Sequence, residues 1–359
     1  MPDQLTFSSS ATLTVLLGRP LRAIPISDAA QALRHAPVLV TGAGGSVGVP
    51  LVARLLAAGV GRVVALDGHE ASLFDLGRRI DFDPRVDLRL ADVRQETKML
   101  RLFADVHPEV VFHLAARKHV PFGEAEPDEP VGVNVLGTDV VARAAIAAGV
   151  SHVVYPSSDK AVNPPSVYGA TKRLAESLLL DFARSQTATQ FHVCRYVNVV
   201  GTRGSVLETF ERQARTTQAL TITDRKMTRY WMAMEEAIDL LWHGLALESG
   251  SRTLLDTGDP IPVEVIAERL YHLVRGAEAT PKWRALGARP GERLFEELVS
   301  ASERMTPYGG GPVMSISTLD PGSASLCPAG MIEQLQRLVA AGDPDPLRAQ
   351  VVELARALQ

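Results

Sequence analysis

The chain has 359 residues, 46% of them hydrophobic and 22% charged, which is enough for a large α/β domain and a smaller one. Its formal charge of −4 argues against a nucleic-acid partner, and its two cysteines, Cys194 and Cys327, argue against a disulfide framework. No run of about 18 apolar residues and no signal-peptide pattern occurs. We therefore expect a cytoplasmic protein without a membrane span.

Apolar strands and helices alternate along the first half of the chain. The sequence predicts strands at residues 37–41, 62–66, 86–90, 110–114, 152–155 and 191–196, and helices at 49–58, 132–148 and 168–184. Such alternation implies right-handed βαβ units and a parallel sheet.

The expected fold class is therefore α/β, a Rossmann-type doubly wound parallel sheet with a smaller C-terminal substrate-binding α/β region. Before the sheet, residues 1–35 are expected to form an N-terminal arm, in which 11–17 is either a helix or a strand. The dinucleotide-binding domain is predicted over 36–200, and a substrate-binding region interleaved with the sheet over 201–325. Residues 326–359 are predicted as a helical tail, in which Val351, Leu354 and Leu358 form an apolar stripe.

A glycine-rich turn follows the first strand. Gly42, Gly45 and Gly48 give a GxxGxxG pattern, with Ser46 and Val47 inside it, and a helical pattern comes next. Strand, glycine turn and helix are typical of dinucleotide binding, because glycine lets the backbone approach a pyrophosphate at a helix N-terminus. Alone, the motif also suits a plain flexible turn.

The second strand ends at Asp67, 19 residues past Gly48. A carboxylate there would hydrogen-bond the adenosine ribose and repel a 2′-phosphate, so NAD is slightly favoured over NADP. Arg78 and Arg79 are close enough in sequence to weaken that preference. A simple helix cap is the alternative role for Asp67.

Further cofactor contacts are expected at the ends of later strands. Asp92 could meet the adenine edge, and the small residues after the fourth strand would let the backbone pass close to the cofactor. The additional predicted cofactor-binding residues are Asp92, Val93, Ala115, Ala116, Lys118, Asn134, Tyr168 and Lys172.

Two pairs of ionisable groups follow the fifth strand. Tyr168 and Lys172 are four apart and would share one face of a helix. Asp159 and Lys160 come directly after the strand end, where open α/β sheets bind their ligands. The structural alternatives are a surface Tyr beside a solvated Lys, and an Asp–Lys ion pair that caps a loop.

The pattern Thr41-Gly-x-x-Gly-x-x-Gly48 with Tyr168-x-x-x-Lys172 resembles the extended short-chain dehydrogenase/reductase superfamily. Further blocks are similar to the UDP-N-acetylglucosamine 4,6-dehydratase family of polysaccharide biosynthesis proteins, over about residues 16–305. They are Phe112-His-Leu-Ala-Ala-Arg-Lys-His-Val-Pro121, Asn134-Val-Leu-Gly-Thr138, Ser157-Ser-Asp-Lys-Ala-Val-Asn-Pro164, Gly169-Ala-Thr-Lys-Arg173, Asn198-Val-Val-Gly-Thr-Arg-Gly-Ser-Val206, Met227-Thr-Arg-Tyr230 and Arg289-Pro-Gly-Glu-Arg-Leu294.

The chain also departs from that family's pattern. Its segment 16–22 resembles the region before the Rossmann domain in the long, membrane-anchored members, so we expect a form without the membrane part. Tyr168 replaces the Met of the long members and resembles the short, C5-inverting ones. Phe122-Gly-Glu124 beside the expected pocket differs from the usual Leu-Met-Glu, so the sugar could differ.

The resemblance implies a nucleotide-sugar 4,6-dehydratase that acts on a UDP-N-acetylhexosamine, with UDP-N-acetylglucosamine preferred. Tyr168 would remove the C4 hydroxyl proton, with its pKa lowered by Lys172, while Ser158 orients the sugar. Lys160 would then act as base at C5 and Asp159 as acid at C6. A UDP-sugar 4-epimerase or another NAD(P)-dependent oxidoreductase is the alternative, and a non-catalytic nucleotide-binding protein is a third reading.

The same resemblance implies contacts to the UDP-sugar. His119 is also a rival acid/base group, because imidazole titrates near neutrality. No metal site is expected, and a homo-oligomer is. The predicted substrate-binding residues are Lys118, His119, Asn198, Arg203, Arg229, Arg289 and Glu292.

Overall fold

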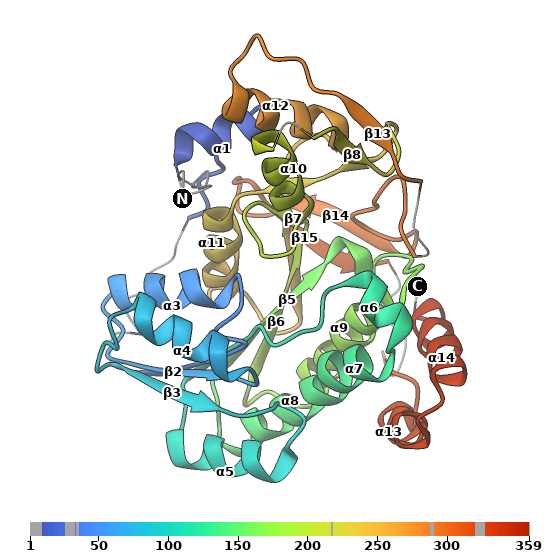
Figure 1. The fold of residues 1–359 in the computed structure, drawn as a ribbon. Coiled ribbons are helices and arrows are strands. Elements are labelled where there is room, and N and C mark those ends of the chain that lie inside the picture. The colour runs from blue at the N-terminus through green and yellow to red at the C-terminus, as the bar shows by residue number, and fades with distance from the viewer. Residues whose placement is uncertain are drawn as a thin grey trace.

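A nine-stranded sheet in the order β14-β15-β11-β6-β5-β4-β1-β2-β3 forms the centre of the computed structural model (Figure 1). The structure describes residues 9–25, 33, 36–216, 218–287, 291–319 and 327–358. Strands β3 to β11 in this order are parallel, whereas β15 is antiparallel to β11 and to β14. The strands are β1 (Pro37–Thr41), β2 (Arg62–Asp67), β3 (Val86–Leu90), β4 (Val110–His113), β5 (His152–Ser158), β6 (Gln190–Tyr196), β11 (Ser251–Leu255), β14 (Glu303–Pro307) and β15 (Val313–Thr318).

Strand β1 pairs with β2 on one side and with β4 on the other. The strand order therefore reverses direction at β1, and the crevice outside the carboxyl ends of β1 and β4 is where such sheets bind ligands. This strand order confirms the predicted doubly wound parallel sheet. It places the expected ligand site at the turns after β1, β2, β4 and β5.

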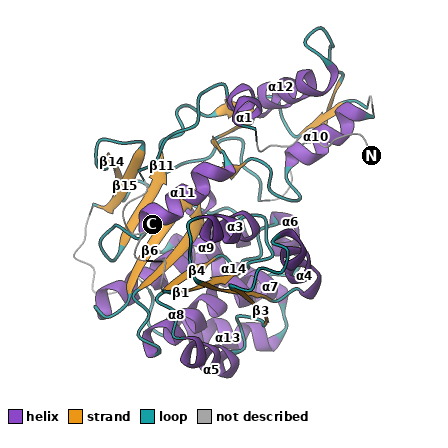
Figure 2. Ribbon diagram, turned by 90° about the vertical axis from the view of Figure 1, so that its left-hand side faces the viewer, coloured by secondary structure: helices purple, strands orange, loops and turns teal. Residues whose placement is uncertain are grey.

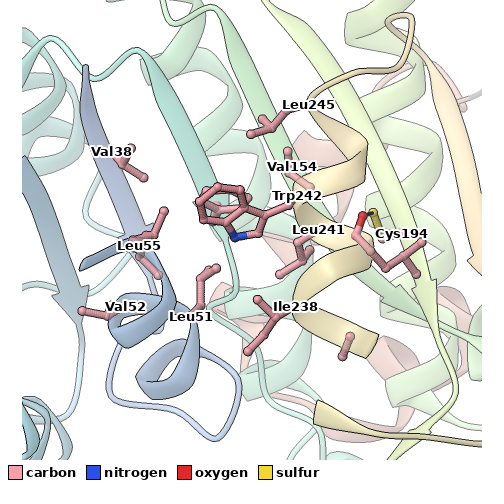
Figure 3. Close-up of a cluster of buried hydrophobic side chains, with 14 of the residues drawn as sticks. Val38, Leu51, Val52, Leu55, Val154, Cys194, Ile238, Leu241, Trp242 and Leu245 are labelled. Atoms are coloured by element: carbon pink, nitrogen blue, oxygen red, sulfur yellow. Dashed lines mark hydrogen bonds between the residues drawn. The ribbon is translucent and has the colours of Figure 1, made fainter. Parts of the chain in front are cut away.

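Helices cover both faces of the sheet (Figure 2). On one face lie α3 (Gly48–Ala57), α4 (Glu70–Arg79) and α11 (Met234–Gly244), and on the other lie α5 (Glu96–Val106), α8 (Gly137–Ala147) and α9 (Val167–Ser185). Figure 3 shows Trp242 of α11 beside Leu51 and Leu55 of α3, packed over Val38 and Val154 of the sheet. These side chains are at most 2% exposed, so burial of apolar surface holds the glycine turn at the sheet edge.

A second group of elements lies beyond the carboxyl ends of the strands. Helices α1 (Ser10–Leu17), α10 (Val206–Arg215) and α12 (Val263–Arg275) share one apolar cluster at the top of Figure 1. Arg19 after α1 forms a salt bridge of 2.6 Å with Glu236 of α11. Three two-stranded sheets complete the region and comprise β7 (Asn198–Val199) with β10 (Trp231–Met232), β9 (Thr228–Arg229) with β12 (Ile261–Pro262), and β8 (Leu220–Ile222) with β13 (Trp283–Ala285).

A long helical stretch connects β4 to β5. It consists of α7 (Asp128–Val131), a π-helical turn η1 (Gly132–Leu136) and α8, with α6 (Val120–Ala125) before it. By length and composition 128–147 could cross a membrane, but 78% of the qualifying window is buried inside the protein. Core helices pass the same test.

The chain ends in two helices, α13 (Met331–Ala341) and α14 (Pro344–Arg356), that cover α7, η1 and α9 (Figure 1). Leu347 and Val351 of α14 are buried in one cluster with Val167 and Ala170 of α9. Helix α14 agrees with the apolar stripe expected at 351–358. Helix α13 also lies within the predicted helical tail. The sequence pattern did not predict β14 or β15, and it left open the helix observed at α1.

Candidate functional site

The turn after β1 has a backbone that accepts only glycine at two positions. Gly42 has a φ of +66°, and a Cβ there would lie 2.8 Å from the Ala115 nitrogen. A Cβ on Gly48 would lie 2.4 Å from the Gly42 carbonyl oxygen. The turn therefore packs directly against the end of β4, and α3 begins with its N-terminus at the crevice, as a pyrophosphate site requires.

Asp67 lies at the end of β2 against this turn. Its Oδ2 accepts a hydrogen bond of 2.9 Å from the Gly44 N–H, and its Oδ1 accepts one of 2.9 Å from the His69 N–H. The cap of α4 is His69, so the alternative role of Asp67 as helix cap is not realised. A carboxylate joined to the glycine turn fits the ribose end of a dinucleotide.

Asp92, the predicted adenine contact, faces Arg94 instead. The Arg94 guanidinium donates to it at 2.7–3.1 Å. Burial acts to raise the Asp92 pKa, but the hydrogen bonds from Arg94 lower it overall. Val93 is buried against Gly137 of α8. An adenine contact from Asp92 stays a prediction, and it would have to share the carboxylate with Arg94.

Asn134 fixes the segment after β4 rather than standing free in the crevice. Its Oδ1 accepts a hydrogen bond from the Arg117 N–H at 2.8 Å. Its Nδ2 donates to the Arg117 carbonyl at 3.0 Å and to Thr171 Oγ1 at 2.9 Å. This buried amide therefore ties the Arg117 backbone, directly after Ala115 and Ala116, to α9.

The end of β5 carries a compact polar cluster. Ser158 Oγ donates to Asp159 Oδ1 at 2.9 Å, and Lys160 Nζ lies 3.1 Å from the same oxygen. A 3₁₀ turn, η2 (Asp159–Ala161), holds the two charged residues just beyond the strand. The Asp159 side chain is 1% exposed, and its Oδ2 has no hydrogen-bond partner among the described residues. A buried carboxylate oxygen without a partner is unfavourable unless a bound molecule supplies one.

Lys160 lies between two carboxylates. Besides Asp159, Glu296 Oε1 lies 3.3 Å from its Nζ. Burial acts to lower the Lys160 pKa, but the negative charges of Asp159 and Glu296 outweigh burial and raise it. Lys160 is therefore an ammonium in this arrangement, whereas a base at C5 has to be a neutral amine.

Tyr168, near the start of α9, faces the same cluster. Burial raises the pKa of its phenol, and the charge of Lys160 and a hydrogen bond with Ser158 act against that shift. The sequence predicts Lys172 as the charge that lowers this pKa, whereas in the structure Lys160 is the cation that acts on the phenol.

Lys172 points into the sheet side of α9. Its Nζ donates to the Pro156 carbonyl at 2.6 Å and lies 4.1 Å from the ring centroid of Tyr155. Burial lowers its pKa to about 7, and Glu176 one turn further along α9 acts weakly in the opposite direction. Tyr168 and Lys172 thus share one helix, but their polar atoms have different neighbours.

The loop after β7 closes onto the glycine turn. The Arg203 N–H donates to Ser46 Oγ at 3.0 Å, and Lys118 Nζ donates to the Arg203 carbonyl at 2.8 Å. His119 packs against Gly204, where a Cβ would lie 2.7 Å from its ring. Three predicted substrate residues, Lys118, His119 and Arg203, therefore lie together beside the glycine turn.

The remaining predicted substrate residues are less directly placed. Asn198 donates its side-chain N–H to the Tyr230 carbonyl at 3.0 Å. Arg229 donates to the carbonyl oxygens of Thr228, Arg293 and Leu294. Glu292 is half-buried in the segment 291–300. Arg289 lies outside the described residues.

Glu296 also lies in the candidate site, and the sequence did not predict it there. It lies in the apolar-looking run Leu294-Phe-Glu-Glu-Leu298, 136 residues from Lys160. Its position directly after the Arg-Pro-Gly-Glu block was the one signal that could have indicated it. Within the described ranges, no three His, Cys, Asp or Glu side chains come together as metal ligands would.

Comparison with known proteins supports the architecture. A family described as "Polysaccharide biosynthesis protein" matches residues 38–317. The chain is 37% identical over 297 residues to the probable polysaccharide biosynthesis protein EpsC of Bacillus subtilis (strain 168), covering 80% of this chain and 49% of EpsC. It is 32% identical over 275 residues to a UDP-glucose 4-epimerase of Rickettsia bellii (strain OSU 85-389), covering 74% and 78%. The chain thus spans about half the length of EpsC.

Two solved structures are also similar. Pen from Bacillus thuringiensis superposes with a TM-score of 0.72 at 28% identity, covering 86% of this chain and 99% of Pen. MoeE5, solved in complex with UDP-glucuronic acid and NAD, has a TM-score of 0.60 at 26% identity, covering 71% and 87%.

Proposed function

Since the chain belongs to the polysaccharide biosynthesis protein family, we propose that it is a nucleotide-sugar 4,6-dehydratase. The proposed substrate is a UDP-N-acetylhexosamine, and UDP-N-acetylglucosamine is the preferred candidate. The reaction is C4 oxidation, loss of water across C5 and C6, and reduction at C6. MoeE5 binds a UDP-sugar together with NAD, which supports a nucleotide sugar and a nicotinamide cofactor for this fold.

The glycine turn and Asp67 would hold the cofactor, with Ser46, Val47 and the 115–118 segment beside it. NAD is favoured over NADP because the Asp67 carboxylate is already directed at the glycine turn. A nicotinamide held there would supply the oxidation at C4 and the reduction at C6.

Tyr168 removes the proton of the C4 hydroxyl. Burial disfavours its phenolate, and Lys160 is the charge that acts against burial. Ser158 hydrogen-bonds Asp159 and contacts Tyr168, so it connects the group that receives the C4 proton with the acid that acts at C6.

The Asp159–Lys160 pair is the observation that favours dehydration over simple oxidation at C4. Oxidation at C4 alone needs a base and a cofactor, whereas elimination also needs a base at C5 and an acid at C6. The unpartnered, buried Asp159 Oδ2 offers a position for the C6 hydroxyl, and Lys160 Nζ lies next to it. Proton transfer from Asp159 releases C6 oxygen as water.

Product analysis tests the proposal directly. The purified protein is incubated with UDP-N-acetylglucosamine in deuterated water, and the product is examined by NMR and mass spectrometry. A 4-keto-6-deoxy sugar with deuterium at C5 is expected, and the configuration at C5 shows whether that centre is inverted. A cofactor that becomes reduced without any loss of water from any UDP-hexose would contradict the proposal.

A UDP-sugar 4-epimerase is the second candidate. It is favoured by the 32% identity to a UDP-glucose 4-epimerase, of which the chain covers 78%. It is also favoured by the raised pKa of Lys160, since an epimerase needs no amine base. Interconversion of UDP-sugars at C4 without dehydration would select this alternative.

We also propose that the protein is a homo-oligomer and that it is located in the cytoplasm. A further proposal is a set of residues that bind the UDP-sugar. All three follow from the family resemblance. The residues proposed for the UDP-sugar are Lys118, His119, Asn198, Arg203, Arg229, Arg289 and Glu292.

A further inference from the structure

Glu296 is a buried carboxylate inside the candidate site that has no role in the scheme above. Its side chain is 4% exposed, and its Oε1 lies 3.3 Å from Lys160 Nζ and 3.5 Å from Arg229 Nε. Buried carboxylates are rare unless they are paired or take part in proton transfer, and Glu296 is paired with both cations. It is the second carboxylate, besides Asp159, in contact with Lys160.

The segment that carries Glu296 is fixed from two sides. Arg229 Nη1 donates to the Leu294 carbonyl at 3.2 Å, and its Nη2 donates to the Arg293 carbonyl at 2.8 Å. Arg293 in turn donates to the Val162 carbonyl at 3.2 Å, just after the turn that holds Lys160. The approach of Glu296 to Lys160 is thus built into the backbone and is not a chance surface contact.

The charges around Lys160 determine whether its amine can lose a proton and act as a base. The groups facing it are Asp159, Glu296, Arg229 and Tyr168. The two carboxylates keep it protonated, and a proton must leave Nζ before the amine can accept one from C5. Asp159 already accepts a hydrogen bond from Ser158 and is assigned as the acid, which leaves Glu296 as the acceptor.

The environment of Glu296 suits that task. Burial raises its pKa, the charges of Lys160 and Arg229 lower it, and Asp159 raises it again, so that the shift is upward overall. A buried carboxyl with a raised pKa is a better proton acceptor for the ammonium beside it, and the exchange removes two buried charges at once.

We propose that Glu296 is the proton acceptor of Lys160 and so makes Lys160 the neutral base at C5. This inference rests on the proposed dehydratase function. One Nζ–H bond breaks and one carboxyl O–H bond forms, with no change in the net charge of the pair. The amine then takes the C5 proton, the C5–H electrons form the C5–C6 double bond, and C6 oxygen leaves as water. The proton for this water comes from Asp159, which received it when the C4 hydroxyl proton passed to Tyr168 and on through Ser158.

The cycle closes without any further reactant. After C6 is reduced, the Lys160 ammonium returns a proton to C5, and Glu296 returns its proton to Lys160. Because Glu296 acts through Lys160 and touches neither sugar nor cofactor, it is a positioning residue in this scheme.

Glu296→Gln tests the inference, because Gln keeps the shape and a hydrogen-bond acceptor but cannot take the proton. We expect water elimination to fall about 100-fold or more, while reduction of the bound cofactor by substrate stays within about threefold. The remaining elimination should increase steeply with pH, since Lys160 must now lose its proton to solvent. Glu296→Asp should restore part of the rate and the wild-type pH dependence.

Glu297→Gln is the matched control. Glu297 is the neighbouring, exposed glutamate, and it accepts a hydrogen bond from Asn163 that Gln can also accept. Its elimination rate should equal that of the wild type. Equal elimination in Glu296→Gln and the wild type would overturn the inference, as would an equal loss of C4 oxidation and elimination.

A second measurement does not depend on dehydration. The pKa of Lys160 is followed by NMR of lysines labelled with ¹³C at Cε, with the signal assigned by Lys160→Met. In Glu296→Gln this pKa should fall clearly, and an unchanged value would refute the coupling. If the wild type gives no dehydration but the coupling is present, the proposed function fails while the Lys160–Glu296 link stands.

Discussion

Lys160 and Lys172 lie twelve positions apart on either side of the start of α9, yet their surroundings act on them in opposite ways. Burial lowers the pKa of Lys172 to about 7, because its Nζ meets a carbonyl and an aromatic ring. Lys160 is also inside the site, but Asp159 and Glu296 raise its pKa. The comparison shows that neighbouring charge, more than burial, sets which lysine carries a proton.

The contrast also divides the chemistry. In the proposed scheme, Tyr168 and the crevice beside the glycine turn serve oxidation at C4. The Lys160 region, which joins η2 to the segment 291–300, serves elimination and also acts on the Tyr168 phenol. Substitutions in each region test this division.

Lys160→Ala should have the largest effect. Elimination should fall by about 10³-fold or more, because the base at C5 is removed. Cofactor reduction by UDP-N-acetylglucosamine should fall much less, by about tenfold, because Lys160 only assists Tyr168 in that step. Absorbance in single turnover measures it. If both steps fell together, the two regions would form a single functional unit.

Tyr168→Phe should give the reverse pattern. C4 oxidation should fall by about 10³-fold because its base is missing. Exchange of the C5 proton in a supplied 4-keto-6-deoxy product should continue, since that step uses Lys160. Proton NMR in deuterated water measures the exchange, and its loss would place Tyr168 in both steps.

Asp159→Asn should have an intermediate effect. The amide keeps the shape but cannot donate an acid proton, so elimination should fall by about 100-fold. Removal of one of its two carboxylates should also lower the Lys160 pKa, so C5 exchange in the 4-keto product should reach its maximum at lower pH. A pH profile of exchange identical to the wild type would contradict this expectation.

Lys172→Met should change stability by a smaller amount that depends on pH. The pKa of Lys172 is about 7 in the folded chain and about 10.4 when unfolded, so the unfolded chain binds more protons between these values. The folded wild type therefore gains stability as pH rises through that window, whereas the variant lacks this gain.

The stability advantage of Lys172→Met should thus be greatest at pH 7 and below. It should shrink by about 1–3 kcal/mol on going to pH 9. Urea unfolding at the two pH values measures the difference between variant and wild type. A difference independent of pH would mean that burial does not lower the pKa of Lys172.

The sequence predicted the parts of the fold that depend on local pattern. The glycine turn, the strands at its sides and the helix of Tyr168 all follow from residues adjacent in the chain, and the doubly wound sheet is confirmed. The added strands β14 and β15 did not follow, because Glu303–Pro307 and Val313–Thr318 have mixed polarity and pair as an edge of the sheet.

The site was predicted in part for the same reason. Asp159, Lys160 and Tyr168 are near one another in sequence, and the structure brings them into one cluster. The approach of Glu296 to Lys160 is a tertiary contact between two loops, and no spacing or period encodes it. The error over Lys172 has a related cause, since a shared helix face does not specify which polar atoms meet.

Helix α9 carries Tyr168 and Lys172, and its outward side is covered by α14. Arg173, next to Lys172, donates to the Leu358 carbonyl, while Arg348 of α14 donates to the Glu124 carbonyl at 2.6 Å. Glu124 accepts a hydrogen bond from the first N–H of α9, that of Val167, at 2.8 Å. Two copies that assembled through this side of α9 would first have to detach the tail, so the chain's own C-terminus competes with any partner for the surface behind its reactive helix.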